Sequence, residues 1–240
     1  MRARAAVAAF AMGLGVASGG CDGLPGKPKP GDQAPLPSQV MAFGALYKVN
    51  CAGCHGADGR LGASRSLNDP LYLALVPRER VRRVIAEGVP GTLQPAFGAA
   101  AGGTLTDAQI DALVSGIFDK WGKSAQGGAA GLPAYAAAAG DAARGQAVYA
   151  TACAACHGPD GRGGPKGKGG AVADPSYLAL VSDQYLRTTV IAGRNDLGMP
   201  DWRGYTQGQP LSEGQISDVV AWLAAQRRPV SGRILPMKGS

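Results

Sequence analysis

Histidine is nearly absent from this chain, because only two occur among its 240 residues. Neither stands alone, since His55 and His157 each directly follow a C-x-x-C pair. Alternation of apolar and polar residues is missing too: no stretch keeps it over a strand's length with turn signals on both sides. Without such segments, the sequence predicts an all-α protein.

A concentrated basic segment is also lacking. Lys and Arg outnumber Asp and Glu by 24 to 17, which gives a formal net charge of +7. The basic residues are scattered along the chain and do not form the patch or stripe typical of nucleic-acid binding. We therefore expect no nucleic-acid partner.

The five cysteines are the most informative residues. Four of them stand in two C-x-x-C-H segments, made of Cys51, Cys54 and His55, and of Cys153, Cys156 and His157. This is the attachment sequence of c-type haem, in which each thiol adds to a haem vinyl group and the histidine becomes the proximal iron ligand. Zinc sites and redox dithiols also use C-x-x-C pairs, but neither requires a histidine directly after each pair. The sequence thus predicts two covalent haems with iron.

The two segments belong to a tandem repeat. "CAGCHGADGR" answers "CAACHGPDGR", "DPLYLALV" answers "DPSYLALV", and "LTDAQIDALV" answers "LSEGQISDVV". The offset between copies grows from 102 residues at Cys51 and Cys153 to 105 residues at Gly88 and Gly193, so the second copy carries three extra residues just past its haem segment. Each copy is a domain of roughly 80 to 90 residues. A core this small is marginal alone, and a covalent haem adds apolar mass to it.

Helix signals recur in both copies. Residues 40–49 and 141–152 are expected to be helical and lead into the haem segments. Pro77 suits the first turn of one later helix, and Ser182 suits the cap of its counterpart. Capping boxes that start the last helix of each copy are predicted at Thr106 with Gln109 and at Ser212 with Gln215.

This order of elements resembles the class I cytochrome c family over about 41–122 and 138–228. In that family the first and last helices cross near a glycine and an aromatic residue, which Gly145, Tyr149 and Trp222 match in the second copy. The first copy departs from the pattern, with Phe43 opposite Gly145 and Gly116 opposite Trp222. The small and large partners are expected to have traded sides there.

The resemblance also implies a methionine as the sixth iron ligand, often followed by proline, on the loop before the last helix. Met199 with Pro200 fits this, whereas the first copy has Gln94 with Pro95. Both histidines are already committed, so the first haem cannot be bis-histidine. Three states remain open for it: ligation by the Gln94 amide, an open or water-filled site, and Met41 reaching in from the first helix, which we rank last.

The N-terminus is typical of an exported protein. Residues 1–20 have a short positive region, an apolar region and small residues, as in a signal peptide, and the apolar run is too short to span a membrane. Cys21 follows directly and resembles the acylated cysteine of a bacterial lipoprotein, although Ser18 stands where a leucine is usual. Residues 21–40 then form a Pro/Gly tether from a lipid anchor. The remaining divisions predicted are domains at 41–122 and 141–228, a linker at 123–140 and a basic tail at 229–240.

These features indicate a membrane-tethered dihaem cytochrome that transfers single electrons on the periplasmic face of a bacterial membrane. The resemblance implies electron flow from a quinol-oxidising complex of the cytochrome bc type to a terminal acceptor, with membrane redox complexes as partners. One alternative is an electron-accepting subunit of a periplasmic dehydrogenase. The other is a peroxidase or gas-binding protein with an open first haem. It is disfavoured because no His, Asp or Glu lies between Glu87 and Asp107 for acid/base work. We therefore expect an electron-transfer protein or subunit more than a stand-alone enzyme.

Overall fold

The computed structural model describes residues 26, 29–122, 131–164, 168–206 and 209–228. The predicted signal peptide, Cys21 and the basic tail 229–240 lie outside these residues. The chain divides into two compact units, Met1–Leu36 and Pro37–Ser240. In the first unit, the described residues form one 3-10 helix, η2 (Pro30–Asp32).

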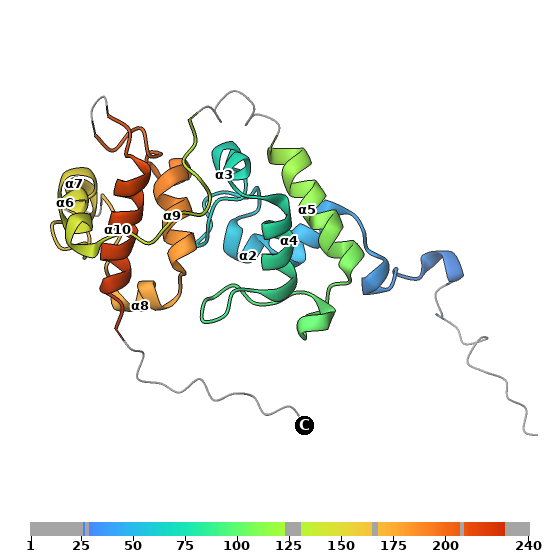
Figure 1. Cartoon of the computed structure of the whole chain (residues 1–240). Helices are drawn as coiled ribbons and strands as arrows, with labels where there is room; N and C mark the ends of the chain where they lie inside the picture. Colours follow the sequence, from blue (N-terminus) through green and yellow to red (C-terminus); the bar gives the residue numbers. More distant parts are fainter. Residues whose placement is uncertain (1–25, 27–28, 123–130, 165–167, 207–208, 229–240) are drawn as a thin grey trace, which may run out of the picture. The chain divides into compact units, whose positions relative to one another are not determined.

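The second unit contains both copies of the repeat (Figure 1). In the first copy, a 3-10 helix, η3 (Pro37–Gln39), precedes the α-helices, and η4 (Ala99–Ala101) lies before the last of them. The α-helices of this copy are α1 (Phe43–Asn50), α2 (Ala52–His55), α3 (Pro70–Leu75), α4 (Arg78–Glu87) and α5 (Asp107–Trp121).

The second copy repeats this order, with the 3-10 helix η7 (Asn195–Leu197) before its last helix. Its α-helices are α6 (Ala142–Ala152), α7 (Ala154–His157), α8 (Pro175–Ala179), α9 (Asp183–Ala192) and α10 (Glu213–Ala225). The only extended pairings in the described parts of the chain are two isolated bridges, Gly98 with Leu105 and Arg194 with Met199. The all-α prediction is confirmed.

The predicted capping boxes are present at the start of α5 and α10. The Thr106 hydroxyl accepts from the Gln109 backbone N–H while the Gln109 side chain accepts from the Thr106 N–H. The amide nitrogen of Gln109 also donates to the carbonyls of Pro37 (2.7 Å) and Val40 (3.0 Å), which fixes the segment before α1 against α5. Ser212 and Gln215 form the equivalent box.

The helices α4 and α9 differ slightly in how they start. The Ser182 hydroxyl accepts from the Tyr185 N–H, so Ser182 caps α9 as predicted. Pro77 does not lie within the first turn of α4 but at its N-cap, one residue before Arg78. Proline has no hydroxyl or carboxylate to cap the free N–H groups, so the first turn of α4 lacks the side-chain cap that α9 has.

Two short helices, α3 and α8, were not foreseen. Each follows an Asp-Pro pair: the carboxylates of Asp69 and Asp174 accept two backbone N–H groups each, and the proline occupies the first helical position. Both local signals favour a helix start.

The first and last helices of each copy cross closely, but the glycine at the crossing lies on different helices in the two copies. A Cβ placed on Gly145 of α6 would lie 1.9 Å from the Asp218 carbonyl oxygen of α10, so only glycine fits there. In the first copy the glycine is on the last helix: a Cβ on Gly116 would lie 2.1 Å from the ring of Phe43. The small and large partners have therefore traded sides, as expected, and both crossings stay close.

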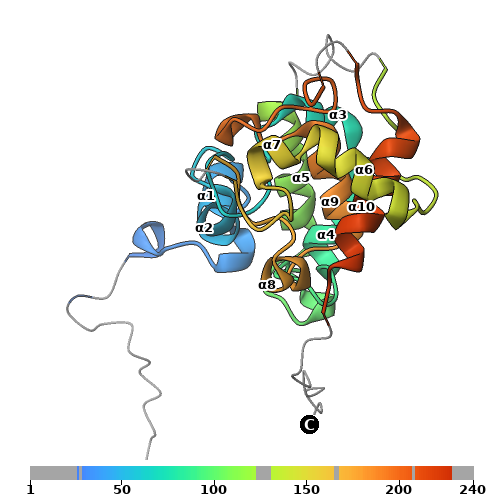
Figure 2. The same cartoon turned by 90° about the vertical axis from the view of Figure 1, so that its left-hand side faces the viewer.

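The two copies pack against each other within the second unit. Helix α3 of the first copy lies against α9 of the second, and Leu75 at its end is buried in the second copy's core. Residues 131–140 run across α9 and α10 towards α6 (Figures 1 and 2). Arg187 of α9 holds this segment by donating to the Ala134 carbonyl at 2.8 Å, and it also pairs with Glu213 at 2.6 Å.

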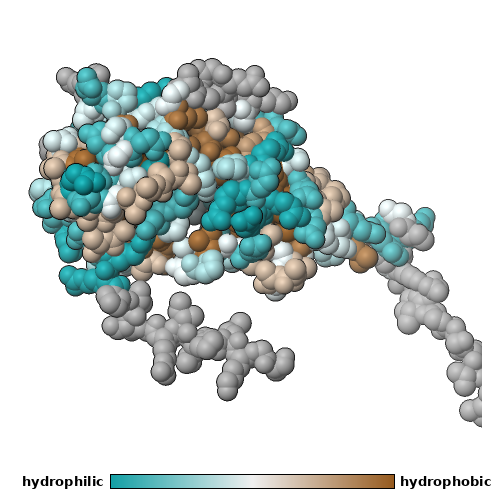
Figure 3. All heavy atoms as spheres, in the orientation of Figure 1, coloured by the Kyte–Doolittle hydropathy of each residue, from teal (hydrophilic) through white to brown (hydrophobic). Residues whose placement is uncertain are grey.

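Hydrophobic side chains at the surface form scattered patches between hydrophilic areas on the face in Figure 3. Large exposed apolar side chains among the described residues are Leu36, Met41, Val49, Leu61, Leu93, Leu180 and Leu197. In the part of the chain described, no helix has the length and apolar character needed to cross a bilayer.

Candidate functional site

Each C-x-x-C-H segment spans a break between two helices. In the first copy, Cys51 ends α1 with its N–H bonded to the Tyr47 carbonyl at 2.9 Å, and α2 then carries Cys54 and His55. Cys153 ends α6 in the same way, and α7 carries Cys156 and His157. Within the described residues, all four thiols are free of disulfide bonds. The short helix brings both thiols and the imidazole to one turn of backbone, as covalent haem attachment requires.

In each copy, a tyrosine of the first helix is hydrogen-bonded to the residue that follows the histidine. The Tyr47 hydroxyl donates to the Gly56 carbonyl at 2.9 Å, and the Tyr149 hydroxyl donates to the Gly158 carbonyl at 2.7 Å. Burial raises the pKa of Tyr149 to about 12, so this hydroxyl keeps its proton and remains a donor. The carbonyl that receives the bond belongs to the residue directly after the histidine in both copies.

The imidazoles are oriented by backbone carbonyls. Nδ1 of His55 lies 2.7 Å from the Arg65 carbonyl oxygen, and Nδ1 of His157 lies 2.9 Å from the Gly170 carbonyl oxygen. A carbonyl only accepts, so each Nδ1 carries the hydrogen and Nε2 is left with its lone pair for a metal. Burial also lowers the pKa of His55, which favours the neutral, ligating form.

The half-buried thiols of Cys51 and Cys153 do not have the character of a redox dithiol. Burial raises the pKa of Cys51 to about 11 and that of Cys153 to about 12, whereas reactive dithiols have lowered pKa values. The described residues also bring no three His, Cys, Asp or Glu side chains together as a metal cluster. Thiol pairs with an oriented Nε2 beside them fit a covalent c-type haem in each copy.

The loop before the last helix has a similar backbone in both copies. In the second copy, Arg194 and Met199 exchange two backbone hydrogen bonds of 3.0 Å each. In the first copy, the Val89 N–H donates to the Gln94 carbonyl at 3.0 Å. Since Val89 and Gln94 each lie 105 positions before Arg194 and Met199, Gln94 occupies the place of the methionine.

Gln94 and Met41, the two candidate side-chain ligands of the first haem iron, lie in different places. The Gln94 amide nitrogen donates to the carbonyl of Pro95 at 3.3 Å, so the amide is turned towards its own backbone. Met41 does not lie on the first helix as predicted, because α1 begins at Phe43. Its neighbour Val40 is held by Gln109, and Met41 itself is 45% exposed.

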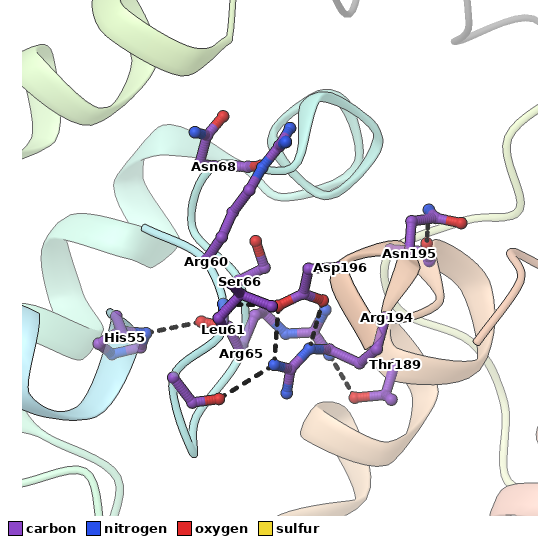
Figure 4. A network of polar contacts seen from close by, with 12 residues as sticks. His55, Arg60, Leu61, Arg65, Ser66, Asn68, Thr189, Arg194, Asn195 and Asp196 are labelled. Atoms are coloured by element: carbon purple, nitrogen blue, oxygen red, sulfur yellow. Dashed lines mark hydrogen bonds and ion pairs between the residues drawn. The ribbon is translucent and has the colours of Figure 1, made fainter. Parts of the chain in front are cut away.

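A polar network beside His55 joins the two copies and was not foreseen from the sequence (Figure 4). The Arg65 guanidinium donates to the Tyr185 carbonyl at 3.2 Å and to the Thr189 hydroxyl, both on α9. Arg194 pairs with Asp196 through two contacts of 2.9 Å. Arg65 and its partners on α9 come from separate copies, so no local sequence pattern predicted those contacts.

This fold and these two sites define a dihaem c-type cytochrome built from tandem cytochrome c domains. The chain belongs to the family described as cytochrome c oxidase, cbb3-type, subunit III, whose family model matches residues 38–115 and 140–223. The two matched segments each contain one C-x-x-C-H site. The chain carries two covalently bound c-type haems.

Similar proteins include subunits named for cbb3-type cytochrome c oxidases. The cbb3-type cytochrome c oxidase subunit CcoP of Azospirillum sp. (strain B510) is 34% identical over 181 residues, which cover 68% of this chain and 56% of that protein. CcoP of Rhodobacter capsulatus is 31% identical over 193 residues, covering 76% of this chain and 60% of that protein. The chain thus spans a little over half the length of these relatives. A solved structure of dihydro-heme d1 dehydrogenase shares 40% identity over 32% of this chain and 16% of that chain, with a TM-score of 0.28.

Proposed function

We propose that this protein carries single electrons on the periplasmic face of a bacterial membrane, from a quinol-oxidising complex of the cytochrome bc type to a terminal acceptor. The observation that carries the proposal is the pair of C-x-x-C-H sites, each with its imidazole Nδ1 bonded to a carbonyl. Relatives named as subunits of cbb3-type oxidases support a terminal oxidase as the acceptor. Bound haem iron supplies the one-electron ferric/ferrous couple.

The residues of this chain suit transfer better than catalysis. The thiols fix the haem covalently, and the carbonyls of Arg65 and Gly170 hold the proximal imidazoles in one orientation. The loop that carries Gln94 holds no acidic or imidazole side chain for proton transfer to a bound peroxide. A peroxidase role therefore lacks its acid/base group.

Electron delivery provides the test. The purified, oxidised holoprotein is expected to be reduced within seconds by quinol and a catalytic amount of a cytochrome bc-type complex, and not by quinol alone. Addition of membranes containing a cbb3-type oxidase, with oxygen, should reoxidise it, as followed by the absorbance of the ferrous haem. No acceleration by either complex, together with hydrogen peroxide turnover by the holoprotein, would contradict the proposal.

A lipid on Cys21 is proposed as the membrane anchor. Cys21→Ser is expected to remove the acylation site, so the variant should appear in the soluble periplasmic fraction or keep its signal segment uncleaved. Fractionation and the mass of the mature N-terminus measure this. The matched control is Ser18→Leu, which restores the usual leucine before the cysteine and should keep the protein on the membrane. Identical processing and fractionation of wild type and Cys21→Ser would show that the anchor lies elsewhere.

A further inference from the structure

The carbonyls that orient the two proximal histidines come from equivalent positions. Arg65 and Gly170 are 105 positions apart, the offset that relates the copies after the three-residue insertion. Both carbonyls bond the Nδ1 of their histidine, at 2.7 and 2.9 Å. Glycine has no side chain, whereas the first copy has an arginine there. Only His55 is therefore oriented by a residue that also has a side chain able to contact the second copy.

The side chain of Arg65 is held by the second copy. The residue is only 5% exposed, and its guanidinium lies over the rings of Tyr72, at 4.6 Å, and Tyr185, at 5.1 Å. It donates to the Tyr185 carbonyl and to the Thr189 hydroxyl on α9. Stacking on two rings and two hydrogen bonds to α9 restrict the orientation of the guanidinium. Its backbone is thereby tied to α9.

Two residues of the second copy, Arg194 and Asp196, also hold the loop between His55 and Arg65. The Arg194 guanidinium donates to the Gly62 carbonyl at 3.0 Å, and the Asp196 carboxylate accepts from the Leu61 N–H at 2.9 Å. The ion pair between Arg194 and Asp196 is nearly buried, with side chains 9% and 4% exposed. Figure 4 shows these contacts converging on the loop that leads from His55 to Arg65.

One residue of this loop has an unusual backbone conformation. Leu61 has a φ of 60°, the only positive value for a non-glycine residue in the described chain, and its side chain is exposed. The equivalent residue of the second copy is Gly163, with a φ of 115°. A leucine in this conformation needs support from its surroundings. The carboxylate of Asp196 gives that support from the second copy.

We propose that Arg65 is a positioning residue through which the second domain tunes the first haem. Thr189 and Tyr185 fix its side chain, its carbonyl fixes the Nδ1–H of His55, and this hydrogen bond sets the electron donation of the imidazole to iron. The proposal rests on the proposed electron-transfer function and adds a link between the domains. The second haem differs, because its histidine is oriented by Gly170, which has no side chain to reach the other domain.

The direction of the effect follows from ligand chemistry. A hydrogen bond from Nδ1 to a carbonyl makes the imidazole a stronger electron donor, which stabilises ferric iron. When the contact between Arg65 and Thr189 is lost, the Arg65 carbonyl is less firmly held and this bond weakens. The midpoint potential of the first haem should then rise, while that of the second stays unchanged.

Thr189→Val tests this without altering the charge near the haem. Valine keeps the shape of threonine but cannot accept the bond from Arg65. The matched control is Thr188→Val, because the Thr188 hydroxyl is buried on the same helix and donates to carbonyls of that helix, those of Gln184 and Tyr185. Thr189→Ser keeps the hydroxyl and should restore the wild-type potential. Potentials are read from an optical redox titration of the full holoprotein.

A second readout is the NMR signal of the imidazole N–H groups, because the chain has only two histidines. ¹⁵N-histidine labelling gives only two imidazoles to observe, and ferrous protein under carbon monoxide keeps both irons low-spin. The Nδ1–H resonance of His55, assigned through backbone connectivities, should move in Thr189→Val and stay in place in Thr188→Val. That of His157 should not move in either variant.

The outcomes separate this inference from the proposed function. A rise in the first haem's potential and a moved His55 resonance in Thr189→Val alone would support it. Unchanged values for the first haem, or a change confined to the second, would overturn it. Haem counting by mass on the same samples is independent, because a protein with fewer than two haems contradicts the dihaem function itself.

Discussion

Replacing Cys153 or Cys156 with alanine is expected to unfold the second domain and to remove the second haem. The second domain, predicted at 141–228, is small and depends on the haem for part of its apolar core. Its own buried cluster is held between α6, α9 and α10. A mass spectrum of the denatured protein should show one haem fewer, and circular dichroism should show the loss of one domain's helical signal.

The same change in the first copy serves as the matched control. Cys51→Ala should remove the first haem and leave the second haem's absorbance in place, with some loss of stability because Leu75 of α3 is buried in the second core. The prediction is wrong if the Cys153 and Cys156 variants keep two haems, or if they lose one haem and keep the full helical signal and thermal transition.

Changing the residue at the sixth position is expected to have the second large effect. A thioether ligand stabilises ferrous over ferric iron, whereas an oxygen, nitrogen or absent ligand favours ferric iron. Gln94→Met should therefore raise the first haem's potential, make it low-spin and add the red-edge absorption of Met-bound ferric haem. Met199→Gln should lower the second haem's potential. A tenfold change in relative affinity for the two oxidation states corresponds to about 59 mV, and we expect shifts of at least this size.

Two further variants separate the three states left open for the first haem. Gln94→Leu removes the amide but keeps a similar volume, so it should change the spin state if Gln94 is a ligand and leave it unchanged if the site is open. Met41→Leu should change neither haem, because Val40 beside it is held by Gln109 and α1 starts after it. A spectral change in Met41→Leu would identify that methionine as the ligand.

Local signals in the sequence predicted a large part of the fold. The capping boxes at Thr106 and Ser212, the helices leading into the haem segments and the exchange of Phe43 with Gly116 all involve neighbours in sequence or aligned repeat positions. Helices α3 and α8 were missed although their Asp-Pro starts were visible, because helices of six and five residues are too short to show a periodic apolar face.

The contacts between the copies could not be predicted in the same way. Arg65 and Thr189 lie 124 residues apart, and nothing in the periodicity of either segment marks them as partners. One signal was available: after the insertion, Arg65 aligns with Gly170, an arginine against a glycine in a repeat that is otherwise similar. Its meaning depends on the packing of α3 against α9, which only the structure gives.

We propose that the difference between Gln94 and Met199 gives the duplication a direction. If the first haem lacks a sulfur ligand and the second has Met199, the first holds the lower potential and electrons run from the first domain to the second. The contacts of Arg65 and Asp196 then keep the two domains together while this transfer occurs. Two identical copies would have no such preference.

The most direct test of this direction is a redox titration of the wild-type holoprotein, followed by optical and electron-paramagnetic-resonance spectroscopy. We expect two haems that titrate in two separate steps, with the Met-type ferric absorption belonging only to the step of higher potential. Two haems of equal potential, both with the Met-type absorption, would contradict it.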